Sequence, residues 1–348
     1  MTTPSSQTVL VTGANGFISA HIIQQLLEKG YHVRGTMRSE SSAGALRKTF
    51  SAYSSQLSIA VVPDITKVEA YESAFEGDIP VTGILHTASP FVLNVENNKR
   101  DLLEPAIEGA VGVLQAAARY GKGKVRRVVS TSSFASIVDI PKGQRPGYTY
   151  SEKDWNPMTY DEAAEEPNGT VAYCASKALA EKAQWKWIEE NKPSFTLATI
   201  CPPWVFGPHI PALTSTKKLN ESSHLLFNII GSSKIPDFDF GGFADVRVVA
   251  AAHIAAFEQD AGAGQRFLVG SHFNYQSAVN AARQTVPELQ SRLPVGDPKA
   301  NPVEEIYTVD GSKASSVLGV KYISLENSMK DSFAELFEAE KHSVTASA

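Results

Sequence analysis

Short apolar runs alternate with longer stretches of helical pattern over the first two-thirds of this 348-residue chain. Several runs are nearly continuous in Val, Ile and Leu, which is typical of strands buried on both faces of a parallel sheet. The stretches between them include "FISAHIIQQLLEKG", an amphipathic pattern that ends near a glycine suited to a helix C-cap. This alternation predicts right-handed crossovers and an α/β fold with a doubly wound parallel sheet. The seven expected strands lie at 8–13, 31–38, 57–64, 81–89, 125–133, 195–202 and 266–270.

The alternating pattern loosens after Gly207, where irregular segments such as "PHIPALTSTKKLNESSHLLFNIIG" replace it. We therefore expect two parts in the chain. Residues 1–206 with about 243–275 should form a dinucleotide-binding domain of Rossmann type. About 207–242 and 276–348 should form a smaller, discontinuous C-terminal lobe that covers the strand ends and holds the substrate.

The composition argues against several functional classes. A formal charge of −5 gives no reason to expect nucleic acid or an anionic membrane as a partner. No apolar stretch approaches the roughly 20 residues that span a bilayer, and the polar "MTTPSSQ" is unlike a secretory signal. The two cysteines, Cys174 and Cys201, form no CxxC pair, and the eight histidines show no metal-ligand spacing. We expect a cytoplasmic protein without a metal site.

A tight turn follows the first expected strand, in "TGANGFISAH". Gly13 and Gly16 stand between strand and helix, where the chain must turn sharply and let a pyrophosphate approach backbone N–H groups. Glycines also simply make turns, so it is their place after the first strand that favours nucleotide binding. Ser19 occupies the position of the third small residue. Asn15, Phe17 and Ile18 complete the expected cofactor loop.

The end of the second expected strand, "VRGTMRSE", indicates which dinucleotide binds. An acid there would bond the ribose 2′-hydroxyl of NAD, whereas an arginine suits the 2′-phosphate of NADP. Arg38 and Ser39 occupy this place, with Arg34 within the strand and Glu40 just beyond. The pattern favours NADP, with Arg38 making paired bonds to the phosphate. Arg38 as a solvated surface charge is the alternative, and Glu40 keeps the choice open.

Tyr173 and Lys177 lie four residues apart in "TVAYCASKALAEKAQWKWIEE", which has a helical pattern. Such a spacing places the phenol and the ammonium on one helix face, where both could act on one bound molecule. Tyr120 also has a lysine four residues on, but two glycines between the partners argue against a helix there. An ordinary surface pair is the alternative for Tyr173 and Lys177.

Three ordered motifs together resemble the extended short-chain dehydrogenase/reductase family. They are the TGxxGxxG-like loop, Ser133 in "STSSFAS" after the fifth strand, and the YxxxK pair on the next helix; the likeness spans about residues 7–275. The pieces "GYHVRGTMRS", "HTASPF", "YSEKDWNP" and "PPWVFGP" are similar to fungal NADPH-dependent aldehyde and ketone reductases, relatives of dihydroflavonol and cinnamoyl-CoA reductases. The resemblance implies catalysis by Ser133, Tyr173 and Lys177.

The resemblance also implies further contacts to the cofactor. Asp64 and Ile65 would flank the adenine, and His86, Thr87, Ala88 and Ser89 would line the cofactor. Two departures from the family pattern are Cys201, where relatives commonly have Asn, and Val248, where they usually have Asp. The first could change the nicotinamide edge, and the second should touch only supporting structure. Pro202 and Val205 would lie near the nicotinamide amide.

The implied reaction is NADPH-dependent reduction of an aldehyde or ketone to the alcohol. Lys177 should favour the phenolate of Tyr173 and lower the pKa of its phenol from about 10, and by resemblance it also holds the nicotinamide ribose. Tyr173 would give its proton to the carbonyl oxygen while Ser133 donates a hydrogen bond to it.

Aromatic residues beside these motifs suggest a hydrophobic or aromatic carbonyl substrate. Each could instead be a core residue. Two other functions stay open: a sugar-nucleotide epimerase or dehydratase on the same fold, and a cofactor-sensing binding protein without activity. The oligomeric state, monomer or homodimer, is open as well. The expected pocket walls are Phe91, Phe134, Trp204 and Phe206.

Overall fold

The computed structural model describes residues 3–89, 95–297 and 305–345. A seven-stranded sheet forms its centre, and every pair of neighbouring strands in it is parallel. All seven expected strands are present, so the prediction of a doubly wound sheet is confirmed. In spatial order they are β10 (Gln265–Leu268), β7 (Thr196–Cys201), β5 (Arg127–Thr131), β4 (Val81–His86), β1 (Thr8–Thr12), β2 (His32–Met37) and β3 (Leu57–Val61).

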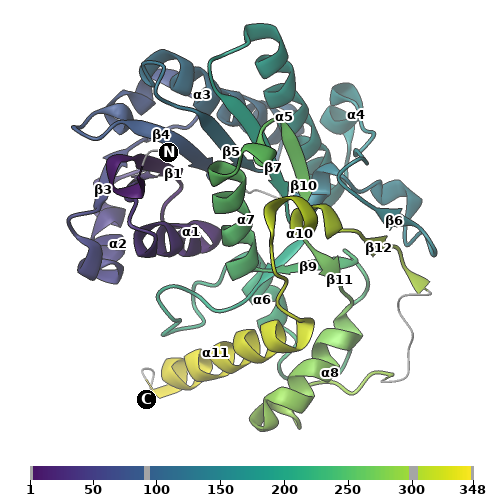
Figure 1. The fold of residues 1–348 in the computed structure, drawn as a ribbon. Coiled ribbons are helices and arrows are strands. Elements are labelled where there is room, and N and C mark those ends of the chain that lie inside the picture. The colour runs from purple at the N-terminus through teal and green to yellow at the C-terminus, as the bar shows by residue number, and fades with distance from the viewer. Residues whose placement is uncertain (1–2, 90–94, 298–304, 346–348) are drawn as a thin grey trace.

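Helices cover both faces of this sheet (Figure 1). The strand β1 shows why its sequence is continuously apolar, because Val9 and Val11 pack into one core and Leu10 into the other. One core is closed by α1 (Phe17–Glu28), α2 (Ala43–Thr49), α7 (Val246–Glu258) and α10 (Ser312–Leu318). The other is closed chiefly by α3 (Glu104–Tyr120) and the end of α5 (Gly169–Asn191).

The strand order reverses at β1. The chain proceeds from β1 to β2 and β3 on one side, then returns to place β4 on the other side of β1. Connections that leave a sheet in opposite directions open a crevice at the carboxyl ends of the strands between them. This crevice is therefore the expected position for a bound dinucleotide.

The later part of the chain adds smaller units below the sheet in Figure 1. A three-stranded sheet contains β8 (Trp204–Phe206), β9 (Gly242–Asp245) and β11 (Ser271–His272). A separate apolar core joins it to α6 (Glu221–Phe227), α8 (Tyr275–Thr285) and α11 (Leu325–Thr345).

Residues 308–318, which we expected in the substrate lobe, contact elements that we assigned to the dinucleotide-binding domain. The strand β12 (Thr308–Val309) pairs with β6 (Thr149–Tyr150), and α10 packs on α7. Ala314 and Leu318 are apolar and buried, so the core beside α7 accommodates them. The remaining short helix, α4 (Tyr160–Glu165), precedes α5.

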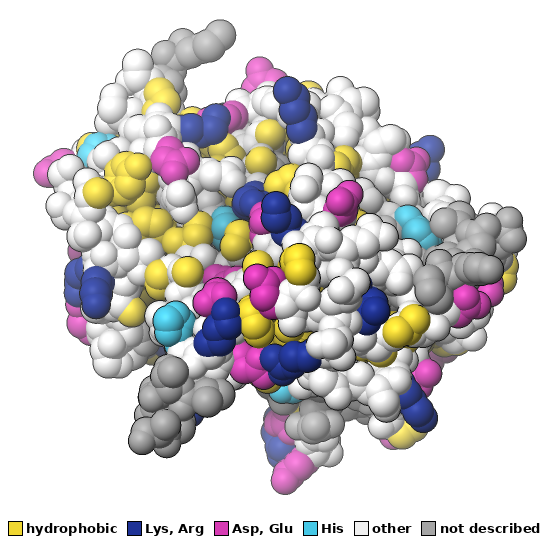
Figure 2. Space-filling model, turned by 90° about the horizontal axis from the view of Figure 1, so that it is seen from below, with side chains coloured by type: hydrophobic (Ala, Val, Ile, Leu, Met, Phe, Trp, Pro, Cys, Tyr) yellow, Lys and Arg dark blue, Asp and Glu magenta, His cyan; other side chains and the backbone are white. Residues whose placement is uncertain are grey.

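The surface carries both signs of charge. On the face seen in Figure 2, basic and acidic side chains are interspersed among apolar ones. Among the helices of the described residues, none is long and apolar enough to cross a membrane. The same residues contain no group of three His, Cys, Asp or Glu side chains that could hold a metal ion.

Candidate active site

The turn after β1 has the geometry that a pyrophosphate requires. Gly13 has a positive φ of 65°, and a Cβ there would lie 3.1 Å from the Cα of Ala88. Only glycine meets both conditions without strain. Ser19 closes the turn by donating to the carbonyl oxygens of Gly13 (2.7 Å) and Gly16 (2.9 Å). Gly16 is the N-cap of α1, so the first N–H groups of this helix lie beside the loop.

Thr12 fixes the neighbouring strand to this turn. Its hydroxyl oxygen accepts hydrogen bonds from the backbone N–H groups of Thr87 and Ala88, both at 3.1 Å. The Thr87 hydroxyl donates in return to the Thr12 carbonyl at 2.5 Å. The ends of β1 and β4 are thereby held together at the crevice. Thr12 is the first residue of the TGxxGxxG-like loop, but the motif alone did not predict that its hydroxyl joins the ends of β1 and β4.

The helix α5 carries Tyr173 and Lys177 on one face, as their spacing predicted. Asn168 caps it by accepting from the N–H groups of Thr170 and Val171, at 3.0 and 3.3 Å. The Lys177 Nζ lies 5.4 Å from the Tyr173 ring centroid. It also donates a 2.5 Å hydrogen bond to the Ser89 hydroxyl at the end of β4.

Tyr120, by contrast, is the last residue of α3 and lies away from this face. Its ring centroid is 6.1 Å from that of Phe75, and the Arg119 guanidinium lies 5.1 Å above it. Lys124 follows after the helix has ended, so no helical pair forms there.

Ser133 lies in the loop after β5, with an extended backbone at φ −159°. Its hydroxyl oxygen accepts a 3.1 Å hydrogen bond from the N–H of Ala135. Ser133, Tyr173 and Lys177 all line one cavity of about 530 Å³. The sequence predicted that these three residues act together, and in the structure they line the same cavity.

Burial dominates the electrostatics of this wall. It raises the pKa of Tyr173 above its usual value, and the neighbouring Cys174 and Glu221 act in the same direction. Burial also lowers the pKa of Lys177 to about 8. The expected lowering of the Tyr173 pKa by Lys177 is therefore not found, because the loss of hydration on burial disfavours the phenolate. The phenol stays protonated at neutral pH.

The other expected cofactor residues follow the crevice. Gly16, Phe17, Ile18, Thr87 and Ser89 line the cavity with the catalytic set. Ile65 and Ala88 border a smaller chamber of about 30 Å³ beside Lys177.

Glycines in α3 let the chain after β3 approach that helix. A Cβ on Gly109 would lie 2.8 Å from the Cδ1 of Ile65, and one on Gly112 would lie 2.8 Å from its carbonyl oxygen. Asp64 is held by accepting from the N–H and hydroxyl of Thr66, at 2.9 and 2.8 Å. These contacts fix the segment that the resemblance assigns to the adenine.

Arg38 is exposed at the end of β2, beyond the glycine turn. The nearby acid Glu40 is occupied by an ion pair with Arg47 at 2.6 Å. Arg34 turns away along the sheet edge, where it donates to Ser58 and to the Ala74 carbonyl. The residues present thus fit a dinucleotide with a 2′-phosphate, since Arg38 is exposed at that end and Glu40, the acid that follows it, is paired with Arg47.

The opposite end of the cavity is largely apolar. Pro202, Pro203, Trp204 and Val205 form one side of it. The Trp204 indole N–H donates to Asp239 at 3.1 Å, and the Tyr275 hydroxyl donates to the same carboxylate at 2.5 Å.

Asp239 is open to the cavity yet surrounded by protein, and burial raises the pKa of its carboxyl. The sequence analysis missed this residue and its neighbours, because the irregular segments that supply them have no periodicity. The acid between aromatics in "PDFDF" was the available signal. The missed wall residues from these segments are Asn220, Glu221, Ser222, Leu225, Asp239 and Phe240; Thr131, Ser132, Ala135 and Thr170 also line the cavity without having been predicted.

Several expected pocket residues have other positions. Phe206 does not line the cavity; it is 2% exposed and packs against Phe273, with ring centroids 5.3 Å apart. Phe134 borders the cavity, but its side chain is 1% exposed and packs in a core with Tyr150 and Tyr307. Phe91 lies outside the described residues.

Cys201 is buried, and its thiol lies 3.9 and 3.7 Å from the two carboxylate oxygens of Glu181. Val248 is buried in the core under α7, consistent with supporting structure.

Comparison with known proteins agrees with this geometry. Residues 9–270 match the model of the NAD dependent epimerase/dehydratase family. The chain is 37% identical to the NADPH-dependent methylglyoxal reductase GRE2 of Saccharomyces cerevisiae, over 95% of this chain and 98% of that protein. It is 38% identical to the ketoreductase azaE of Aspergillus niger, over 95% and 97%.

A solved structure shows the same likeness throughout the chain. The crystal structure of yeast methylglyoxal/isovaleraldehyde reductase Gre2 complexed with NADPH has a TM-score of 0.89 and 36% identity, and the match covers 97% of this chain and 100% of that one. The chain therefore belongs to the NAD dependent epimerase/dehydratase family, that is, to the extended short-chain dehydrogenases/reductases.

Proposed function

We propose that this protein is an oxidoreductase that uses NADPH to reduce an aldehyde or ketone to the alcohol. The observation that carries the proposal is the common cavity wall formed by Ser133, Tyr173 and Lys177, in a cavity that reaches the glycine turn at Gly16. The names of the relatives, an NADPH-dependent methylglyoxal reductase and a ketoreductase, support the same reaction.

Each of the residues on the cavity wall has a separate role in the proposed reaction. NADPH, when bound along the crevice, supplies a hydride to the carbonyl carbon. Tyr173, which burial keeps protonated, gives its proton to the carbonyl oxygen. Ser133 accepts from Ala135, and no described residue is seen to accept from its hydroxyl, so its hydrogen can be donated to the developing alkoxide. Lys177, held by Ser89, supplies positive charge near the phenol.

Preference for NADPH rests on the end of β2. Arg38 would face the 2′-phosphate, while Glu40 is paired with Arg47. An arginine can make paired, charge-assisted bonds to phosphate.

The apolar walls favour a hydrophobic or aromatic carbonyl compound. Trp204, Leu225 and Phe240 line the substrate end, and burying an apolar group there contributes roughly 1.5–3 kcal/mol. Residues 207–242 with α8 and α11 would form the lobe that closes over this end. The two free, buried cysteines are compatible with a cytoplasmic, reducing compartment.

The test is a panel of aldehydes and ketones assayed by NADPH consumption, with product alcohols identified. Turnover of several carbonyls with NADPH is the expected result. Tightly copurified NAD with no net NADPH oxidation would support the epimerase alternative instead. Cofactor binding without any turnover would support a cofactor-sensing protein.

A further inference from the structure

Glu181 lies on the same helix as Tyr173 and Lys177, and the three follow one another at intervals of four residues. They therefore share one face of α5. Unlike the other two, Glu181 does not line the main cavity, and it is 2% exposed. A buried carboxylate is costly unless it is paired and fully hydrogen-bonded. Its position needs an explanation that the proposed proton transfer does not supply.

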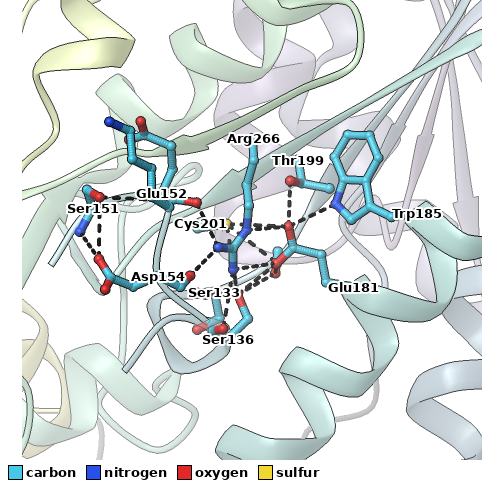
Figure 3. Close-up of polar contacts among 12 residues, drawn as sticks. Ser133, Ser136, Ser151, Glu152, Asp154, Glu181, Trp185, Thr199, Cys201 and Arg266 are labelled. Carbon is cyan, nitrogen blue, oxygen red and sulfur yellow. Dashed lines mark hydrogen bonds and ion pairs between the residues drawn. The ribbon is translucent and has the colours of Figure 1, made fainter. Parts of the chain in front are cut away.

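The Glu181 carboxylate accepts hydrogen bonds on both oxygens (Figure 3). Oε2 accepts from the hydroxyls of Ser132 at 2.5 Å and Ser136 at 2.7 Å. Oε1 accepts from the Thr199 hydroxyl at 2.6 Å and from the Trp185 indole at 3.3 Å. These donors come from the loop after β5, from β7 and from α5 itself.

Arg266 of β10 compensates the charge. Its Nε lies 2.8 Å from Oε1 of Glu181, and its Nη2 lies 3.1 Å from Oε2. The same guanidinium donates to the Ser136 hydroxyl at 2.7 Å and lies 3.6 Å from the centroid of the Trp155 ring. Burial opposes ionisation of Glu181, but Arg266 and the hydroxyl donors hold the pKa of the carboxyl below its usual value.

Members of this hydrogen-bond network both precede and follow Ser133 along the chain. Ser132 precedes it and donates to Glu181, while the single hydroxyl hydrogen of Ser136 is shared between Glu181 and the Ser133 carbonyl oxygen, each 2.7 Å from Ser136 Oγ. Glu181 thus ties the backbone that carries the Ser133 hydroxyl to the helix that carries Tyr173. Buried ion pairs contribute little net stability compared with apolar side chains of similar volume. The ion pair of Glu181 and Arg266 is better explained as holding the active-site residues in position.

We propose that Glu181 is a positioning residue: through Ser132 and Ser136 it sets the Ser133 hydroxyl against the phenol of Tyr173. The proposal rests on the proposed carbonyl reduction. Arg266 belongs to the same unit, because it neutralises Glu181 and holds Ser136 from the other side.

The first test is Glu181→Gln. The amide keeps the shape but replaces one accepting oxygen by an N–H₂ group, so at least one hydroxyl loses its acceptor. A shift of about 1 Å in a reacting group can cost about 10²-fold, and we expect kcat to fall by about that factor. NADPH affinity should be unchanged, because Gly13 and Arg38 are not touched.

Glu340→Gln is the matched control. It breaks another hydrogen-bonded ion pair, with Arg292 at 2.6 and 2.8 Å, on the helix α11. This variant should keep the wild-type kcat even if the protein melts earlier.

A double-mutant cycle separates positioning from general stability. Ser133→Ala alone should lower kcat by about 10²–10³-fold, as for loss of a transition-state donor. If Glu181 acts through Ser133, adding Glu181→Gln to Ser133→Ala should lower kcat no further. The proposal would be overturned if the losses of kcat in the two single variants multiplied in the double variant, or if Glu181→Gln kept the wild-type kcat. A wild type without carbonyl reduction would instead refute the proposed function.

Should Glu181→Gln fail to fold, Ser136→Ala replaces it in the same cycle. That change removes only the hydroxyl between Glu181 and the Ser133 carbonyl. Thr199→Val is its control, since it removes a hydrogen bond to Glu181 that does not lead to Ser133. The proposal is supported if Ser136→Ala lowers kcat in the wild type but not in the Ser133→Ala background, and if Thr199→Val does not lower kcat. Equal losses of kcat in Ser136→Ala and Thr199→Val would overturn the proposal.

Discussion

The Lys177 ammonium donates a 2.5 Å hydrogen bond to the Ser89 hydroxyl and so joins α5 to the end of β4. Two motifs that lie far apart in sequence, "HTAS" and YxxxK, meet at this contact. It holds the charge of Lys177 within 5.4 Å of the Tyr173 ring centroid. The activity should therefore depend on the protonation state of Lys177.

We expect kcat/KM for carbonyl reduction to fall as the pH rises through about 8. Burial lowers the pKa of Lys177 to about 8, so the ammonium is present below this pH and lost above it. Lys177→Arg should move the alkaline limb to higher pH, because a guanidinium stays charged. Lys182→Met is the control, since Lys182 donates to the Asn156 carbonyl and does not line the cavity. The same limb in Lys177→Arg and wild type would contradict this assignment.

Arg38→Asp should reverse or abolish the preference for NADPH over NADH. The change removes the cation and places an acid where a ribose 2′-hydroxyl would bind. Arg34→Met is the matched control, because Arg34 is engaged with Ser58 and Ala74 along the sheet edge. The measurement is the ratio of kcat/KM for the two cofactors. Equal use of both cofactors by the wild type would refute the role of Arg38.

Trp204→Ala should change the substrate profile, whereas Phe206→Ala should change the stability of the fold. Trp204 lines the cavity, so its truncation should shift turnover toward bulkier carbonyls with NADPH affinity nearly intact. Phe206 is a core residue, so its truncation should lower the free energy of unfolding by about 3–5 kcal/mol and leave the substrate profile unchanged. Chemical denaturation and the carbonyl panel measure the two effects. A wild-type profile in Trp204→Ala would remove Trp204 from the pocket wall.

The sheet was predictable because several strands, β1, β4, β5 and β7 among them, are buried almost throughout and so have nearly continuous apolar sequences. The cofactor turn and the YxxxK helix were predictable because their geometry is local: a positive φ at Gly13 and a four-residue spacing on α5. The residues that pack over a given side chain often come from segments far away in the sequence. Phe206 is covered by Phe273, and Phe134 by Tyr307, and nothing near either residue in sequence indicates this.

The ion pair of Glu181 and Arg266 shows the same limit. The partners are 85 residues apart, and the sequence analysis singled out neither. A signal existed, because Arg266 begins the expected strand at 266–270, and a charge that is buried in a strand requires a partner. The identity of that partner follows only from the tertiary arrangement, in which β10 places Arg266 opposite Thr199 of β7, a donor to Glu181 of α5.

Tyr173→Phe tests the central claim most directly, with Tyr120→Phe as the matched control. The change removes only the phenolic hydroxyl, so kcat for carbonyl reduction should fall by about 10²–10⁴-fold, the range for a general acid. NADPH binding, followed by fluorescence titration, should stay at the wild-type level. Tyr120→Phe should behave as the wild type in both measurements, since Tyr120 lies at the end of α3 beside Phe75. Wild-type turnover in Tyr173→Phe, or its loss in Tyr120→Phe, would contradict the account.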